Sequence, residues 1–158
     1  MANYNQIRFG HREGPGKGRE YGVAASQAFA RKGGKFVYMS TAGTVTLAGG
    51  CKESIFGWAE VPKDASATNF WTSSATAHES KVFVIYGLED VFEVPYYSAS
   101  ASVCASTLSV NLGIYSSGGV QMLATSCNTA SECFSVVDYD KNENTVFVKI
   151  DPDCKQTA

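Results

Sequence analysis

The sequence predicts an all-β protein, a small antiparallel β-barrel or sandwich of about eight strands with an extended N-terminal arm. Apolar runs of about four to six residues, rich in Val, Thr, Phe and Tyr, recur along the chain. Gly and Ser separate these runs, and no long amphipathic helical pattern interrupts them. A chain of 158 residues fits one domain that buries roughly 70% of its unfolded surface.

The composition is typical of a globular protein, with 44% hydrophobic and 18% charged residues, which excludes wholesale disorder. The uncharged segment 96–130 is rich in Ser, Thr, Gly and Asn, so we expect no membrane span. The N-terminus lacks the apolar core of a signal peptide, so we expect synthesis in the cytoplasm.

The N-terminal region is basic and glycine-rich. Residues 1–35 contain seven Lys or Arg and two Glu, a net charge of +5 on a chain whose total is −2. We interpret residues 1–22 as an extended arm and residues 23–158 as a single β-rich domain. A basic arm on an acidic body indicates contact with an acidic surface, and a solvated tail without a partner is the alternative. The side chains expected to make the contacts are Tyr4, Ile7, Arg8, Phe9, Arg12, Lys17 and Arg19.

The segment 23–32 is expected to form one short helix, ended by Gly33 and Gly34. Three short apolar runs follow it, separated by Gly-containing turns. They predict a meander of three antiparallel strands at residues 36–39, 44–47 and 55–58.

The second half of the chain carries the clearest strand signals. Residues 81–86 form an alternating run, and a turn at 87–90 leads into 91–95, where Pro95 marks a strand end or a sheet edge. Two pairs of runs with short polar connections predict hairpins. The paired runs are 108–115 with 120–124 and 134–139 with 145–150.

Two long polar segments, 62–80 and 96–107, have no assigned role. The first contains Phe70 and Trp71, and a connection of this length is commonly functional or ordered by a partner. We expect both aromatic side chains to cover the edge of the core, with ligand contact as the alternative.

Two motifs resemble ligand-binding loops but lack required residues. Gly10–Gly18 resembles a phosphate loop, yet His11 replaces a required glycine and Gly18 replaces the hydroxyl residue. The segment 138–144 has the spaced oxygen ligands of a calcium loop, but Glu143 and Lys149 occupy the positions of its glycine and its bidentate glutamate. We interpret this second segment as a hairpin turn.

Five cysteines, with no C-x-x-C pair, are expected to be mostly reduced thiols that act as small apolar side chains. Cys127 and Cys133 could close a small loop if the protein matures outside a cell. Neither histidine lies at ligand spacing from a cysteine pair, so we predict no zinc site, and no other metal or cofactor.

Nothing in the sequence predicts an enzyme. The chain has two histidines, one in the arm and one in a Ser/Thr-rich loop, and neither position suggests the base of a catalytic triad. Glu89, Asp90 and Glu93 leave a paired-carboxylate hydrolase as the enzymatic alternative, but acids that flank a strand are typical of a solvated face. The body lacks the interleaved basic and aromatic side chains of a nucleic-acid-binding surface.

Three stretches resemble the small β-rich head decoration, or capsid cement, proteins of tailed double-stranded DNA phages. The first is Gly33–Val61, with its Gly-Gly pair, GTVTLA and IFGWAEV. The others are VFVIYGLEDVFEVPY at 82–96 and FSVVDYDKNENTVFVKI at 134–150. Together they cover 61 of the 158 residues.

The resemblance implies a non-enzymatic virion protein that is made in the host cytoplasm and added to the outer face of the expanded capsid. There it would bridge neighbouring major capsid protein subunits, often as a homotrimer, with no nucleic-acid or membrane partner. The arm would drape over the capsid or an adjacent copy, losing conformational entropy as it gains contacts.

The alternative is a receptor- or glycan-binding β module of a virion. In that interpretation Trp71, Tyr96 and Tyr97 would serve as stacking platforms. The loop residues that we expect to make contacts in either case are Phe70, Trp71, Tyr96 and Tyr97.

Overall fold

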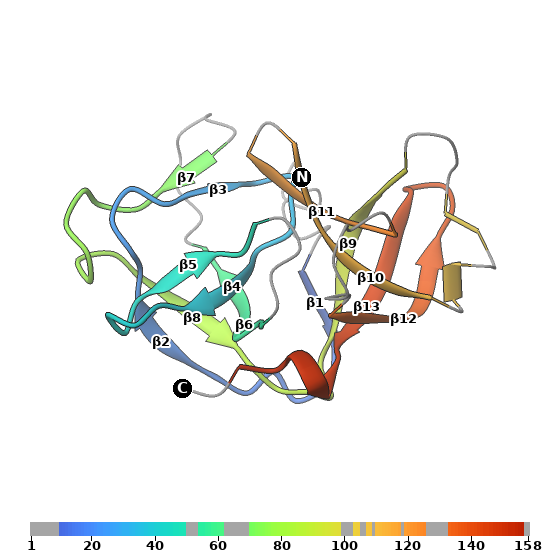
Figure 1. The fold of residues 1–158 in the computed structure, drawn as a ribbon, viewed down its shortest axis with the longest axis horizontal. Coiled ribbons are helices and arrows are strands. Elements are labelled where there is room, and N and C mark those ends of the chain that lie inside the picture. The colour runs from blue at the N-terminus through green and yellow to red at the C-terminus, as the bar shows by residue number, and fades with distance from the viewer. Residues whose placement is uncertain are drawn as a thin grey trace, which may run out of the picture.

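The computed structural model describes residues 10–49, 54–61, 70–98, 103–104, 107–108, 110–117, 119–125 and 133–156. These residues form thirteen strands and no α-helix, which confirms the all-β prediction. Figure 1 shows two strand-rich halves side by side. The strands beyond the expected eight include short ones near the N-terminus and in the long loop: β1 (Gly10–Glu13), β2 (Gly18–Gly22), β3 (Ala28–Ala30) and β7 (Phe70–Thr72).

One half is a closed five-stranded barrel in the order β9-β11-β10-β12-β13, because β13 pairs back onto β9. The β9–β11 pair is parallel and the other pairs are antiparallel. Alternate side chains point inward, as Phe92 and Val94 of β9 do. The strands are β9 (Val91–Tyr97), β10 (Asn111–Ser117), β11 (Val120–Ala124), β12 (Phe134–Asp140) and β13 (Thr145–Ile150).

The other half is an antiparallel sheet in the order β2-β8-β6-β4-β5. Its inner strands are buried on both faces: Phe36 and Trp58 join the barrel core, whereas their neighbours Val37 and Ala59 join a second core. The β3–β7 ribbon contributes Phe29 and Trp71 to this second core. The remaining strands are β4 (Phe36–Met39), β5 (Val45–Leu47), β6 (Gly57–Glu60) and β8 (Lys81–Ile85).

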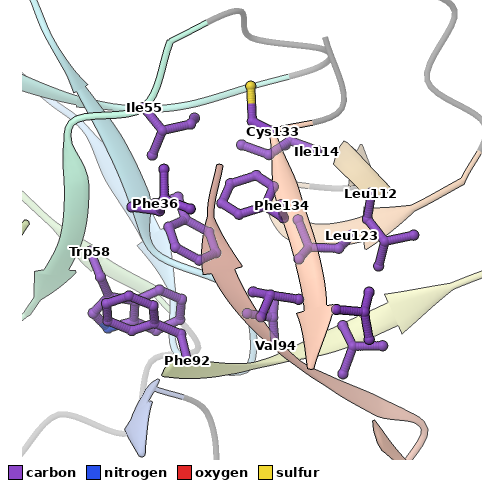
Figure 2. Close-up of a cluster of buried hydrophobic side chains, with 14 of the residues drawn as sticks. Phe36, Ile55, Trp58, Phe92, Val94, Leu112, Ile114, Leu123, Cys133 and Phe134 are labelled. Atoms are coloured by element: carbon purple, nitrogen blue, oxygen red, sulfur yellow. The ribbon is translucent and has the colours of Figure 1, made fainter. Parts of the chain in front are cut away.

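Aromatic rings fill the boundary between the two halves (Figure 2). The Phe36 ring lies 4.9 Å from the Trp58 ring, 5.5 Å from Phe92 and 4.3 Å from Phe134, measured between centroids. Trp58 and Phe92 stack with an interplanar angle of 15°. Rings from β4, β6, β9 and β12 thus form one cluster, which ties the sheet to the barrel.

Two glutamine side chains bind the backbone of β4. The Oε1 atom of Gln121, on β11, accepts from Phe36 N at 2.9 Å, and its Nε2 donates to Phe36 O at 3.0 Å and Ala48 O at 2.7 Å. Gln156 binds Met39 in the same way, at 2.7 and 2.9 Å. Each amide supplies a donor and an acceptor as a neighbouring strand would, so β4 is bonded to the barrel and to the C-terminal segment.

Two sequence-based expectations about the first half are wrong. Residues 28–30 form β3 rather than part of a helix, because Phe29 pairs with Trp71 and is buried in the second core. The predicted meander has a different order, since β4 lies between β5 and β6. Phe36 and Val37 belong to different cores because successive side chains of β4 point to opposite faces of the sheet.

Both predicted hairpins are confirmed, as β10–β11 and β12–β13. The turn of the second hairpin uses Asp140, whose Oδ1 accepts from the N–H groups of Asn142 and Glu143. Asn144 has a φ of 55° and bonds β9 through Tyr96 O. The calcium-like segment therefore acts as a turn, as we predicted.

Residues 10–22 of the expected arm form β1 and β2, which pair with β9 and β8. The rest of the arm, residues 1–9, lies outside the described residues. The part of the arm that the structure describes is thus built into both sheets.

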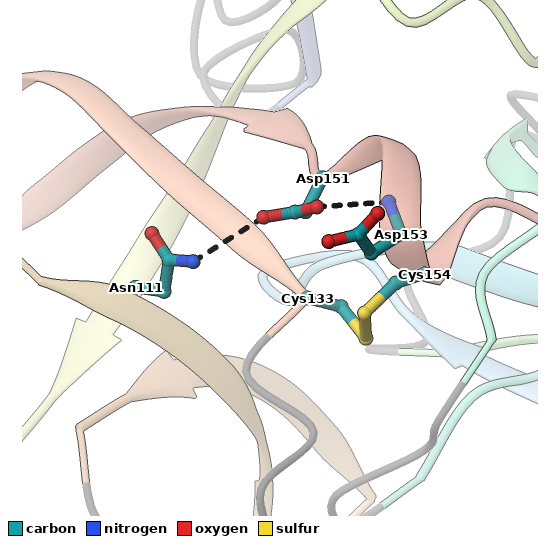
Figure 3. The surroundings of a disulfide bond; sticks show 5 residues. All are labelled: Asn111, Cys133, Asp151, Asp153 and Cys154. Carbon is teal, nitrogen blue, oxygen red and sulfur yellow. Dashed lines mark hydrogen bonds between the residues drawn. A yellow bond between two sulfur atoms is a disulfide. The ribbon is translucent and has the colours of Figure 1, made fainter.

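A disulfide joins Cys133, at the start of β12, to Cys154 (Figure 3). The expectation of reduced thiols is wrong for this pair. Their Cα atoms lie 5.4 Å apart although the residues are 21 positions apart in sequence, because the β12–β13 hairpin returns the chain to its starting point. Cys51 and Cys127 lie outside the described residues.

We predict that Gln121→Met destabilises the protein by about 2–4 kcal/mol. Methionine preserves the side-chain length, but Phe36 N and Ala48 O lose the bonds that the amide makes at this buried site. Urea unfolding measures the loss. Gln27→Met, which removes a longer bond of 3.3 Å to Leu47 N, is the control and should cost less; equal stabilities of Gln121→Met and the wild type would contradict the assigned role.

Candidate binding surfaces

Strand β1 is fixed to the barrel through charged side chains. Arg12 Nε lies 2.9 Å from Glu93 Oε1, and the hydroxyl of Thr145 donates to Glu93 Oε2 at 2.7 Å. Glu93 is only 7% exposed, so both of its oxygens are committed inside the fold. Arg12, which we expect to contact a partner, also helps to hold β1 on β9.

The glycine-rich segment that resembles a phosphate loop surrounds a carboxylate of its own chain. Asp90 is fully buried, and its Oδ1 atom accepts from Gly16 N and contacts His11 Nε2, both at 2.8 Å. A Cβ atom at Gly14, where φ is +101°, would lie 2.6 Å from the same oxygen. The glycines therefore allow a close approach to Asp90, which accounts for the pattern without a nucleotide.

The acidic cluster near β9 differs from the solvated face that we expected. Glu89 is exposed, but Asp90 and Glu93 are buried and bonded to β1 and its flanking loop. These two carboxylates have structural partners in the N-terminal segment that lie 74 to 81 positions away, too far for a local sequence pattern to reveal them.

Lys17 and Arg19, the other described basic residues of the arm, have exposed side chains. Lys17 O accepts from Tyr86 N at 3.0 Å, and Arg19 pairs with Val84 in the β2–β8 ladder. Their backbones are held by β8 while their charges face solvent. Tyr4, Ile7, Arg8 and Phe9 lie outside the described residues.

An exposed row of side chains crosses three strands of the second sheet. The register places Glu20 of β2 opposite Phe83 of β8, and Phe83 opposite Glu60 of β6. Phe83 is 42% exposed and both glutamates are exposed. On the same face, the next row contains Ile85 and Trp58, which the barrel covers. We call Glu20, Phe83 and Glu60 the acidic row.

The acidic row presents one large apolar side chain between two carboxylates, chemistry that suits a basic segment with aromatic or aliphatic side chains. The Phe83 ring leans over Gly18, where a Cβ atom would lie 2.8 Å from it. Sequence analysis missed this row, because the pairing of three distant strands that assembles it leaves no local pattern.

The four expected loop contacts lie in different surroundings. Trp71 packs on Phe29 with ring centroids 5.8 Å apart, so it covers the second core as expected. Phe70 lies beside Gly119 at the β10–β11 turn. Tyr96 points into the barrel and is 9% exposed, whereas Tyr97 points outward. Tyr96 and Tyr97 thus lie on opposite faces of β9 and cannot share one platform.

Tyr97 stacks on Tyr115 of β10, with centroids 4.1 Å apart and an interplanar angle of 7°. A hydrogen bond with Tyr115 raises the pKa of Tyr97, and the charge of Tyr115 and the slight desolvation of Tyr97 act in the same direction. The sequence identified Tyr97 but not Tyr115, which becomes its neighbour because β10 and β9 flank β11.

Lys35 is a buried cation at the start of β4. Its Nζ donates to Gly33 O at 3.0 Å and to Arg31 O at 3.3 Å, and it lies 5.8 Å from the centroid of Trp58. Burial lowers its pKa from 10.5 to about 8, against an opposing contribution from Glu60. The site favours the neutral amine more than water does.

Within the described ranges, no group of three or more His, Cys, Asp or Glu side chains is placed to hold a metal ion. Those ranges also contain no helix long and apolar enough to cross a membrane. Comparison with protein-family models, with curated proteins and with solved structures finds no match.

We predict that the wild type gains about 2 kcal/mol in unfolding free energy relative to Lys35→Met between pH 7 and pH 10. The folded-state pKa of Lys35, about 8, lies below the unfolded value of 10.5. Between these values the unfolded chain binds more protons, so stability rises as the pH increases through the folded pKa. Urea unfolding of both proteins across this range measures the difference, and parallel pH profiles would contradict the burial of the cation.

Proposed function

We propose that this protein is a non-enzymatic structural component of a virion, which binds the outer capsid surface and cements neighbouring major capsid protein subunits. The resemblance of residues 33–61, 82–96 and 134–150 to phage decoration proteins motivates the proposal. In this proposal the chain is made in the host cytoplasm, joins the expanded capsid, and acts as a homotrimer without cofactor, nucleic acid or membrane.

The observation that carries the proposal is the attachment of the basic N-terminal segment. Residues 1–9 precede β1 in the sequence, and β1 pairs with β9 and is fixed by the Arg12–Glu93 contact. Strand β9 also pairs with β11 and β13. A load applied to the segment is therefore transmitted to a closed barrel, which suits a protein that resists the separation of its partners.

The acidic row supplies a complementary feature on the body. Residues 1–9 contain Ile7, Arg8 and Phe9, in which one basic side chain stands between two apolar ones. Glu20, Phe83 and Glu60 present the opposite charge and an apolar centre. In this account the segment of one copy contacts the capsid or the acidic row of the next copy, which links neighbours on the surface.

We predict that a variant lacking residues 2–9 folds normally but loses most of its binding to capsids. The deletion must end at residue 9, because removal of residues 10–20 would also delete β1 and most of β2. Co-sedimentation with empty expanded capsids of the phage that carries its gene measures occupancy, and high salt should weaken it.

The matched control is Lys141→Gln, which removes one positive charge from the exposed β12–β13 turn, set against Arg8→Gln in the segment. Arg8→Gln should lower occupancy and Lys141→Gln should not. Unchanged occupancy after the deletion would remove the segment from the account. A wild-type protein that does not bind capsids would overturn the proposal itself.

The stacked Tyr97–Tyr115 pair favours a second candidate, a receptor- or glycan-binding module of a virion. Aromatic faces on the outside of a barrel suit contact with sugar rings. This candidate predicts saturable binding to surface polysaccharide by the isolated protein, weakened at least tenfold by Tyr97→Ala. Calorimetric titration measures it, with Phe83→Ala, which removes an exposed aromatic ring from β8 in the other half, as the control for loss of an aromatic side chain.

A further inference from the structure

The C-terminal segment, residues 151–156, connects the barrel to the second sheet. After β13 ends at Ile150, Asp151 caps a short 3₁₀ turn, η3 (Pro152–Cys154), by accepting from Asp153 N at 2.9 Å. Its other oxygen accepts from Asn111 Nδ2, on β10, at 3.3 Å (Figure 3). We call residues 151–156 the strap.

The far end of the strap is bonded to the second sheet. Ile55 N donates to Cys154 O and Gln156 N donates to Ile55 O, each at 2.8 Å. The Gln156 amide then binds both backbone groups of Met39 on β4. Lys155 Nζ lies 4.8 Å from the Phe56 ring centroid and 5.9 Å from that of Tyr86. These contacts involve β4, the two residues before β6 and the residue after β8, but no barrel strand.

The disulfide is the covalent link between these two sets of contacts. Cys133 belongs to the barrel core and is 1% exposed, and its carbonyl accepts from Asp151 N at 2.7 Å. Cys154 lies in the strap, where its own carbonyl accepts from Ile55 N and the next two residues make the other contacts with the second half. The bond therefore fixes the strap at the point where it leaves the barrel.

We propose that the Cys133–Cys154 pair is a redox latch, open while the protein is in a reducing compartment and closed after it leaves. The more accessible Cys154 thiolate attacks a small-molecule disulfide such as oxidised glutathione and forms a mixed disulfide, releasing one glutathione thiolate. The Cys133 thiolate then attacks the Cys154 sulfur and releases the second. Two protein thiols are oxidised and one glutathione disulfide is reduced.

The latch acts on the strap and not on the fold as a whole. Without the bond, the barrel keeps its closed ladder and its aromatic core, and the second sheet keeps the Gln121 contacts. The strap keeps its hydrogen bonds, the Lys155 ring contacts and the packing of Cys154 on the barrel core, but it loses its covalent link to Cys133, so its local opening becomes more frequent. The inference requires no capsid and stands apart from the proposed function.

Amide hydrogen exchange of the oxidised and the reduced protein tests the latch. Reduction should accelerate exchange at the Ile55 and Gln156 amides by about 100-fold. The amides of Val94 and Val148, in the barrel ladder, should change less than threefold. Equal exchange at Ile55 and Gln156 in the oxidised and reduced proteins would overturn the latch. An equal acceleration at all four amides would also overturn it, because the disulfide would then stabilise the whole fold and not the strap alone.

A variant with both Cys133→Ala and Cys154→Ala separates this pair from the other cysteines. It should match the reduced wild type at Ile55 and Gln156, and reductant should change it no further. If the variant fails to fold, reduction of the folded wild type gives the same comparison. Peptide mapping after incubation with oxidised glutathione should identify a Cys133–Cys154 cross-link, and a bond from Cys133 to another cysteine would overturn the assignment.

Discussion

The arrangement of the two halves depends on a buried amide, the side chain of Gln121. It bonds the N–H and carbonyl groups of Phe36 and also Ala48 O, so β11 and β4 are joined where no ladder connects them. Gly34 N adds a backbone bond of 2.7 Å to Gln121 O. A buried amide has to be satisfied in full to be stabilising, and all three of these bonds fall on the same boundary.

The position of the Gln121 amide explains why a glycine precedes β4 and how Phe36 of β4 joins the aromatic cluster. A Cβ atom at Gly34 would lie 2.6 Å from Gln121 Oε1, so a larger residue would displace the amide. With β4 held in this position, Phe36 reaches Phe92 and Phe134 of the barrel, while Val37 faces the second core. One strand thus serves two hydrophobic cores, and the acidic row lies on the part of the sheet that the barrel leaves uncovered.

Short-range sequence patterns predicted the features that depend on residues close together in the chain. The all-β class, both hairpins of the second half and the turn at Asp140 follow from alternation and turn residues near one another in sequence. The sequence did not predict the position of β4, the Cys133–Cys154 bond or the roles of Asp90 and Gln121, because each depends on residues far apart in the chain. The acidic row was not predicted for the same reason, because its three residues come from strands far apart in the chain. Composition described the arm, but only the β1–β9 pairing shows that residues 10–13 of the arm are part of a sheet.

The central claim is that barrel and second sheet form one cooperative body, the rigid unit that a capsid-binding protein would need. Nuclear magnetic resonance across a urea series tests it, with the amides of Val148 in the barrel and Val84 in the second core as probes. The account predicts that both native signals disappear with the same midpoint and slope. Loss of the Val84 signal at a lower urea concentration, with Val148 still native, would show two independent units and contradict it.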